Sequence, residues 1–161
     1  TVAVLDRPGQ ADLIRTVRQV GARLKLIQDG DVSAAIATAF PETGVDVLMG
    51  VGGAQEGVLA AAAIQCLGGD MQGRLRPRNA QELQRARELG IKDIERIFRI
   101  GELATGKDLM FAATGVTDGD LLRGVRFFGG GARTHSVVMR WRSGTTRMIE
   151  ATHRFDRHPS Y

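Results

Sequence analysis

The sequence predicts a layered α/β domain, in which a mixed sheet with its first three strands parallel is flanked by helices. The first observation is a threefold succession of strand, turn and helix over residues 2–67, typical of parallel strands joined by right-handed crossovers. The second is a run of extended segments after residue 107, ending in an expected hairpin, so these strands should be antiparallel. With 161 residues, the chain has the size of one domain, residues 1–161.

The first half of the chain shows the parallel pattern directly. Short apolar segments predict strands at residues 2–5, 24–27 and 45–49. Each leads through a turn into a segment with helical periodicity, and these helices are expected at residues 11–20, 32–40 and 54–67. Gly21 and Pro41 are residue types that end helices, and they follow the first two.

After Gly69 the pattern changes. Residues 70–78 are polar and extended in character, and a helix at residues 80–89 is expected between Asn79 as its N-cap and Gly90 as its C-terminal stop. Residues 91–103 are predicted to be irregular or short-helical. Four further strands are expected, the last two joined by a hairpin turn at residues 142–145; they lie at residues 108–116, 125–128, 134–141 and 147–153.

Composition narrows the classes of function. The formal net charge is +4, and all of the excess lies in the second half of the chain, but aromatics make up only 5% of the residues. Nucleic-acid binding is therefore not expected, and an anionic small substrate or an acidic partner surface explains the charge. The single Cys66 excludes a disulfide framework and fits a cytoplasmic protein. No apolar run approaches the length of a membrane span, and Thr1 opens directly into a strand, as expected for a piece of a longer chain.

The stretch from Val45 to Gly57 carries the clearest chemical signal. An apolar strand leads through three glycines into the start of a helix, where free backbone N–H groups favour an anion. Glu56 lies in the first helical turn, where a carboxylate and a phosphate would share the site through a metal ion. The alternative is that Glu56 only offsets the helix dipole, and spacing alone favours this alternative. The glycine spacing matches neither a dinucleotide fingerprint nor an ATPase phosphate loop.

Parallel strands place their carboxyl ends at one edge of the sheet, where α/β folds bind ligands. The turns after the three strands should therefore bring several candidate residues together. Asp29 and Asp31 flank Gly30 before a helix, a pattern suited to metal ligation or to sugar hydroxyls, although Asp31 is equally suited to an N-cap. The residues expected along this edge are Arg7, Asp29, Asp31, Gly52, Gly53 and Glu56.

Five blocks of sequence, in this order and spacing, resemble the bacterial class II fructose-1,6-bisphosphatases, including the bifunctional fructose-1,6-/sedoheptulose-1,7-bisphosphatases of photosynthetic bacteria. The blocks are LDRP at residues 5–8, KLIQDGD at 25–31, GVGGAQEG at 50–57, CLGGDMQG at 66–73 and FAATGVTDG at 111–119. The resemblance extends over nearly the whole chain, but it covers only the carboxyl-terminal part of the family's protein. It implies a further amino-terminal region that holds most of the metal-binding carboxylates.

The resemblance also implies roles for individual residues. The family's last metal ligand falls on Glu56, which makes the ligand interpretation the preferred one, and a substrate contact falls on Gly53. Substrate contacts of the Asp-Gly-Asp motif fall on Asp29, Gly30 and Asp31. A segment that is basic-Pro-basic in many members falls on Arg7, Pro8 and Gly9, where Gly9 departs from the pattern. No catalytic residue is assigned to this half.

The fold implied is the layered α/β fold shared by the lithium-sensitive sugar and inositol phosphatases. The activity implied is hydrolysis of the 1-phosphate of fructose 1,6-bisphosphate with Mn²⁺ or Mg²⁺, in gluconeogenesis or the Calvin cycle; the sequence does not decide whether sedoheptulose 1,7-bisphosphate is also a substrate. A homo-oligomer is expected, and this chain without the missing amino-terminal half is expected to be inactive. The alternative function is a non-catalytic phosphosugar-binding or regulatory module.

Overall fold

The computed structural model describes residues 1–28 and 30–156. Its first half is built on a parallel sheet of three strands in the order β2-β1-β3, formed by Val2–Leu5 (β1), Leu24–Ile27 (β2) and Val47–Met49 (β3). Val4 in the central strand pairs with a residue of each neighbouring strand and is fully buried. The predicted parallel pairing is confirmed.

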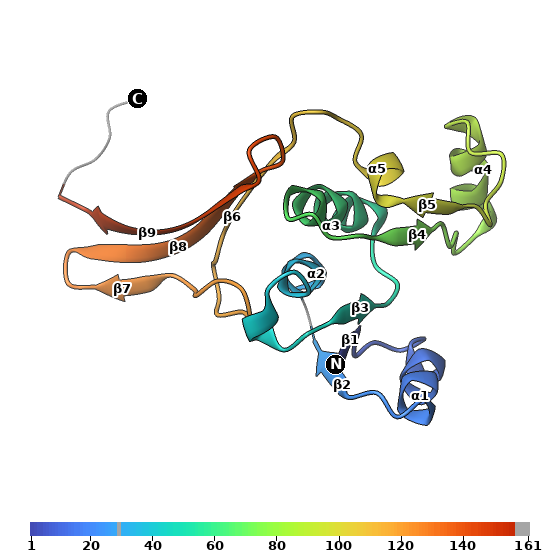
Figure 1. The fold of residues 1–161 in the computed structure, drawn as a ribbon, viewed down its shortest axis with the longest axis horizontal. Helices are drawn as coiled ribbons and strands as arrows, with labels where there is room; N and C mark the ends of the chain where they lie inside the picture. Colours follow the sequence, from blue (N-terminus) through green and yellow to red (C-terminus); the bar gives the residue numbers. More distant parts are fainter. Residues whose placement is uncertain (29, 157–161) are drawn as a thin grey trace.

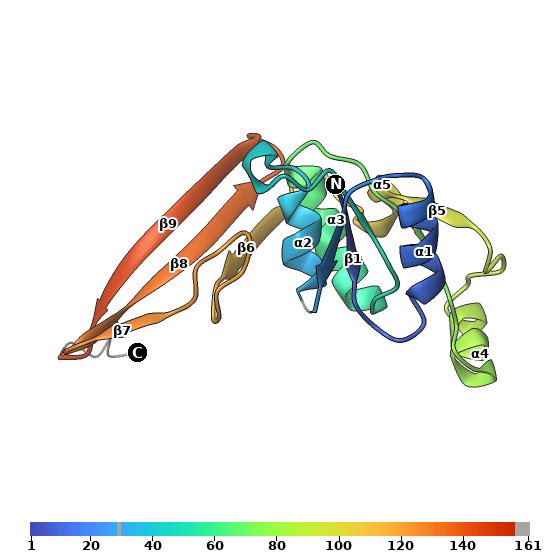
Figure 2. The ribbon, with the colours of Figure 1, turned by 90° about the horizontal axis from the view of Figure 1, so that it is seen from below.

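The helices of this half lie on both sides of the sheet. Helix α1 (Ala11–Gln19) covers one face and places Val17 against it, and α2 (Asp31–Ala37) and α3 (Ala54–Cys66) cover the other. Between α2 and β3 the chain forms a 3-10 turn, Pro41–Thr43. Figure 2 shows the resulting layers, with α1, the parallel sheet and the α2–α3 pair in succession.

The second half contributes an antiparallel sheet that packs on the far side of α2 and α3. Strand β8 (Gly131–Arg140) pairs along its length with β9 (Thr145–Arg154), and its other edge pairs with β6 (Met110–Thr114) and β7 (Arg126–Phe128). The hairpin turn between β8 and β9 contains Gly144 at a positive φ of 58°, as the sequence predicted for residues 142–145. Figures 1 and 2 show this sheet beside the α2–α3 layer.

The single mixed sheet predicted from the sequence is wrong. Over the described residues, the parallel and antiparallel strands belong to separate sheets. The small residues of α3 explain the separation, because this helix is buried on two sides. Its Ala60 and Ile64 pack with Ala35 towards the parallel sheet, while Ala63 and Cys66 pack with residues of β6 and β8. A helix layer that is apolar on both faces stabilises two sheets, one on each side.

A smaller unit follows α3. Strands β4 (Gln72–Arg74) and β5 (Ile97–Arg99) form an antiparallel pair, with α4 (Ala80–Glu88) between them and the single turn α5 (Ile100–Leu103) after them. The Asn79 side chain accepts a hydrogen bond from the Glu82 N–H, and Gly90 has a φ of 89°, so both predicted ends of α4 are confirmed. The strand β5 lies where an irregular or helical segment was expected. No helix of the described residues is long and apolar enough to cross a membrane.

Candidate functional site

The turns that follow β1, β2 and β3 lie at the same edge of the parallel sheet. The first carries Arg7, Pro8 and Gly9, the second leads into Asp31, and the third runs from Gly50 to the start of α3. This placement follows from the three parallel pairings, because all three carboxyl ends must then point the same way. Of the residues predicted for this edge, Asp29 lies outside the described residues.

The first two turns are joined by an ion pair. A guanidinium nitrogen of Arg7 lies 3.5 Å from Asp31 Oδ1, and the Asp31 side chain is only 17% exposed. Asp31 is the first residue of α2, and Gly30 before it adopts a left-handed conformation with φ 87°. This conformation favours glycine and turns the chain sharply from β2 into α2. Asp31 is thereby held inside the edge of the sheet rather than on its surface.

Two glycines of the third turn lie in close contact with carboxylate oxygens from two different helices. A Cβ atom added at Gly52 would lie 2.6 Å from Asp31 Oδ2, and one added at Gly53 would lie 2.0 Å from Glu56 Oε2. Both carboxylates therefore occupy space that only glycine leaves open. Gly53 is also the N-cap of α3, and its carbonyl accepts the Gly57 N–H at 3.0 Å. Within the described part of the chain, the Glu56 carboxylate makes no hydrogen bond that would serve as a helix cap.

Gln10 joins the first turn to the third, and the sequence analysis missed it. This residue is only 5% exposed, and its Nε2 lies 3.5 Å from the carbonyl oxygen of Val51. Its Oε1 is buried and has no hydrogen-bond partner among the described residues. An added Cβ at Gly50 would lie 3.0 Å from that oxygen, so a third glycine of the same turn makes room for the amide.

A sequence signal for Gln10 existed. It occupies the N-cap of α1, where Ser, Thr, Asp or Asn is preferred, and its side chain makes no capping hydrogen bond. In the structure, the Gln10 side chain contacts the glycine turn instead. In the same turn, Gly9 adopts a φ of 93°. A basic residue at this position would be strained, so the departure from the basic-Pro-basic pattern accompanies a turn that requires glycine.

The side chains at this edge supply only some of the ligands that a divalent metal ion requires. Among residues 1–28 and 30–156, no three His, Cys, Asp or Glu side chains converge on one point. Glu56 offers one carboxylate without a partner in this part of the chain, and Asp31 offers a second that is engaged by Arg7. Mg²⁺ and Mn²⁺ favour carboxylate oxygens but need six ligands in all. The residues present therefore fit one ligand of such an ion and require others from elsewhere.

The comparisons with known proteins agree on one family. The family model described as bacterial fructose-1,6-bisphosphatase, glpX-encoded, matches residues 1–153. Three relatives carry the name D-fructose 1,6-bisphosphatase class 2/sedoheptulose 1,7-bisphosphatase. One from Synechococcus sp. (strain JA-3-3Ab) is 48% identical over 168 residues, covering 97% of this chain and 48% of the relative.

The other two cover similar shares. One from Microcystis aeruginosa (strain NIES-843) is 46% identical, covering 99% of this chain and 50% of the relative. One from Synechococcus elongatus (strain PCC 7942) is 47% identical, covering 96% and 48%. The chain thus spans about half the length of the curated relatives it matches.

Proposed function

The chain belongs to the bacterial fructose-1,6-bisphosphatase family, and we propose on this premise that it forms the substrate-binding half of a metal-dependent sugar-bisphosphate 1-phosphatase. The observation that carries the proposal is the convergence of three turns, in which Arg7, Asp31 and Glu56 are gathered at one edge of the sheet. The reaction is hydrolysis of fructose 1,6-bisphosphate to fructose 6-phosphate and phosphate. Water attacks phosphorus, the bond to the sugar oxygen breaks, and that oxygen takes up a proton.

Each of these residues has a part suited to its charge. Arg7 binds the phosphate that does not react, which supplies binding energy away from the chemistry. The pairing of Arg7 with Asp31 fixes both side chains, so that the Asp31 carboxylate is oriented to accept hydrogen bonds from sugar hydroxyls. Asp29 and Gly30 take part in the same contacts, as do Pro8 and Gly9 on the other side of the edge.

The start of α3 binds the phosphate group that is cleaved from the sugar. The backbone at Gly53 lacks a side chain, so an anion can approach the free N–H groups of the first helical turn. Glu56 in this turn would hold a divalent metal ion, Mg²⁺ or Mn²⁺, together with carboxylates of the remaining half. The chemistry that such an ion would supply when bound is a lower charge repulsion between water and the anionic phosphate and a stabilised leaving oxygen. Because Glu56 would be repelled by a bare phosphate, its presence beside an anion site favours this arrangement.

The experiment measures phosphate release from fructose 1,6-bisphosphate with saturating Mn²⁺. The chain is assayed alone, then mixed with a separately produced amino-terminal half, and then as the complete protein. We expect turnover by the complete protein and none by the chain alone, since residues 1–28 and 30–156 bring too few carboxylates together for the ions. Substantial turnover by the chain alone would refute the division of the site between two halves, and an inactive complete protein would refute the activity itself.

The second candidate function is a non-catalytic phosphosugar-binding module. The Arg7–Asp31 pair favours it, because these residues suit sugar phosphate without any ion. Calorimetry of the chain with fructose 1,6-bisphosphate in the presence of a chelator separates the two. Binding that needs no metal, together with a complete protein that does not hydrolyse the sugar, would establish the module instead of the enzyme.

A further inference from the structure

Helix α3 carries no charged side chain after Glu56. Its residues from 57 to 66 are small or apolar, except for Gln65. The helices α1 and α4 instead present charged side chains such as Arg15 and Arg85 to solvent. A helix that is apolar on all sides is typical of one surrounded by protein. The composition of α3 therefore predicts a covering layer on every side of it.

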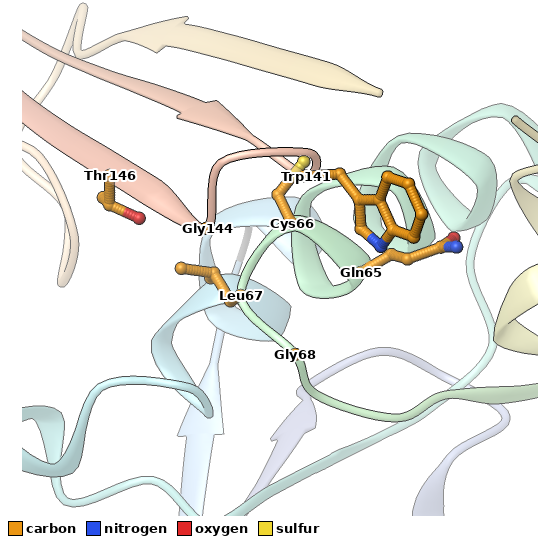
Figure 3. A pocket seen from close by; sticks show the side chains of 7 residues that line it. All are labelled: Gln65, Cys66, Leu67, Gly68, Trp141, Gly144 and Thr146. Carbon is orange, nitrogen blue, oxygen red and sulfur yellow. The ribbon is translucent and has the colours of Figure 1, made fainter. Parts of the chain in front are cut away.

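The C-terminal half of α3 is covered within the chain. Ala63, Ile64 and Cys66 are at most 5% exposed, and Ala63 and Cys66 pack with residues of β6 and β8. Figure 3 shows the end of the helix beside the β8–β9 hairpin, where Gln65 and Cys66 lie next to Trp141. The apolar character of this half is thus accounted for by its neighbours.

The N-terminal half of α3 has an apolar side that is open to solvent. Val58 is 45% exposed and Leu59 is 52% exposed, although the next residue, Ala60, is buried. Leu59 follows Glu56 by three residues, so it lies on the same side of the helix, one turn further on. The side chain beside the proposed metal ligand is therefore a large apolar one.

The strand and turn before α3 are open in the same way. Over the described residues, β3 pairs with β1 alone, so its other edge is free. The strand contains neither a charged residue nor proline, the residue types that protect an exposed edge. The large apolar side chains of this strand, turn and helix that are 41–52% exposed, together called the β3–α3 surface, are Val47, Met49, Val51, Val58 and Leu59.

The proposed metal site indicates what covers this surface. Glu56 is one ligand, and the described residues bring no group of further ligands to it, so carboxylates of the remaining half must approach it. Ligand oxygens lie about 2.1 Å from Mg²⁺, so the chain that carries them must come close to Glu56 and hence to Leu59. The relatives are about twice as long as this chain, so the remaining half has the size of a domain.

We propose that the remaining half of the complete protein docks on the β3–α3 surface, covering Val58 and Leu59 and carrying its carboxylates to Glu56. The inference rests on the proposed function, because the shared metal site identifies the occupant. The contact itself is apolar, so burial of this surface stabilises it without metal or substrate.

The test compares the reactivity of a thiol on this surface in the chain alone and in the complete protein. Leu59→Cys is made in both and treated with a maleimide, and Gln81→Cys, on the exposed side of α4, is the matched control. Cys66 is buried and its pKa is raised by burial, so it reacts slowly, and the unchanged proteins give the background. We expect Leu59→Cys to react roughly a hundredfold more slowly in the complete protein, because labelling then requires local opening. Gln81→Cys should react equally in both.

Two further measurements separate docking from catalysis. Protection of Leu59→Cys should persist in a chelator and in combination with Glu56→Gln, which removes the proposed ligand but not the apolar contact. Val58→Cys gives a second position on the same surface. A protected thiol in a complete protein without turnover would support the docking and refute the phosphatase activity.

Two outcomes would overturn the docking. One is equal labelling of Leu59→Cys and Val58→Cys in the chain and in the complete protein, even if the complete protein is active. The other is protection in the chain alone that increases with its concentration, since a second copy would then occupy the surface.

Discussion

The substitution Gly53→Ala should displace the Glu56 carboxylate while leaving the other side chains of the site in place, so it tests whether the position of this carboxylate matters. The new Cβ would lie 2.0 Å from Glu56 Oε2, whereas real Cβ contacts are essentially never shorter than 3.0 Å, so this oxygen must move by at least 1.0 Å. The backbone adds no strain, because Gly53 has φ −69° and ψ 149°, which any residue adopts. Metal–ligand distances tolerate about 0.2 Å, so the displacement removes Glu56 from a position suited to a ligand.

The expected result is a fall in turnover of about a hundredfold in the complete enzyme, the loss that a misplacement of about 1 Å produces. Calorimetric titration with Mn²⁺ should show weaker binding, while the temperature of unfolding stays close to that of the unchanged protein. The reasoning fails if Gly53→Ala retains both full turnover and full Mn²⁺ affinity.

Gly57→Ala is the matched control within the same helix. An added Cβ at Gly57 meets no atom within 4 Å, so the carboxylate of Glu56 is undisturbed. Alanine favours a helix more than glycine does, and the unfolding free energy should rise by up to about 1 kcal/mol. Turnover and Mn²⁺ affinity should remain unchanged, which separates displacement of the ligand from a general effect of adding a methyl group to α3.

Four further results are expected. Glu56→Gln should abolish Mn²⁺-dependent turnover of the complete enzyme but leave its circular dichroism and melting unchanged, and retained turnover would leave Glu56 only the role of offsetting the helix dipole. Gln10→Leu should change the unfolding free energy by less than about 1 kcal/mol, because it removes an unpartnered buried oxygen along with the contact to Val51, and chemical denaturation measures this. Asn79→Ala should lower the unfolding free energy by about 1 kcal/mol through loss of the α4 cap, without affecting turnover.

The fourth result concerns pH. The pKa of Asp118 is lowered by the hydrogen bond from the Gly124 N–H and by the Arg126 guanidinium. A carboxylate with a lowered pKa contributes stability above its unfolded pKa, and this contribution is lost as the pH falls through the folded value. In urea unfolding, Asp118→Asn should therefore be less stable than the unchanged protein at neutral pH, and the difference should disappear in strong acid.

The parallel part of the fold was predictable because its signals are local. Each strand, turn and helix unit carries its own pattern, and the handedness of the crossover then orders the three strands without knowledge of distant contacts. The same rule predicts from the sequence alone that Arg7, Asp31 and Glu56 lie at one edge of the sheet. Helix ends marked by Asn79 and Gly90 were predictable for the same reason, since a cap depends on neighbours in the chain.

What the sequence did not reveal depends on contacts between distant segments. The separation of the sheets arises because α3 is buried on two sides, and alanines such as Ala60 and Ala63 show that neighbours are close without showing which neighbours. The third turn presents the same problem in the site. Its glycines predict an approach by some group, but only the structure shows that Gly50 makes room for Gln10, Gly52 for Asp31 and Gly53 for Glu56.

Each glycine of this turn contacts a side chain from a different place in the chain. The turn is therefore a common packing surface for these three side chains. Gln10 comes from the start of α1, Asp31 from the start of α2, and Glu56 from α3 itself. A displacement of the turn must then move Gln10 and both carboxylates together, including the Asp31 and Glu56 groups that we propose for sugar and metal. The glycines are therefore needed less for freedom of the backbone than for the close approach of three polar side chains to one turn.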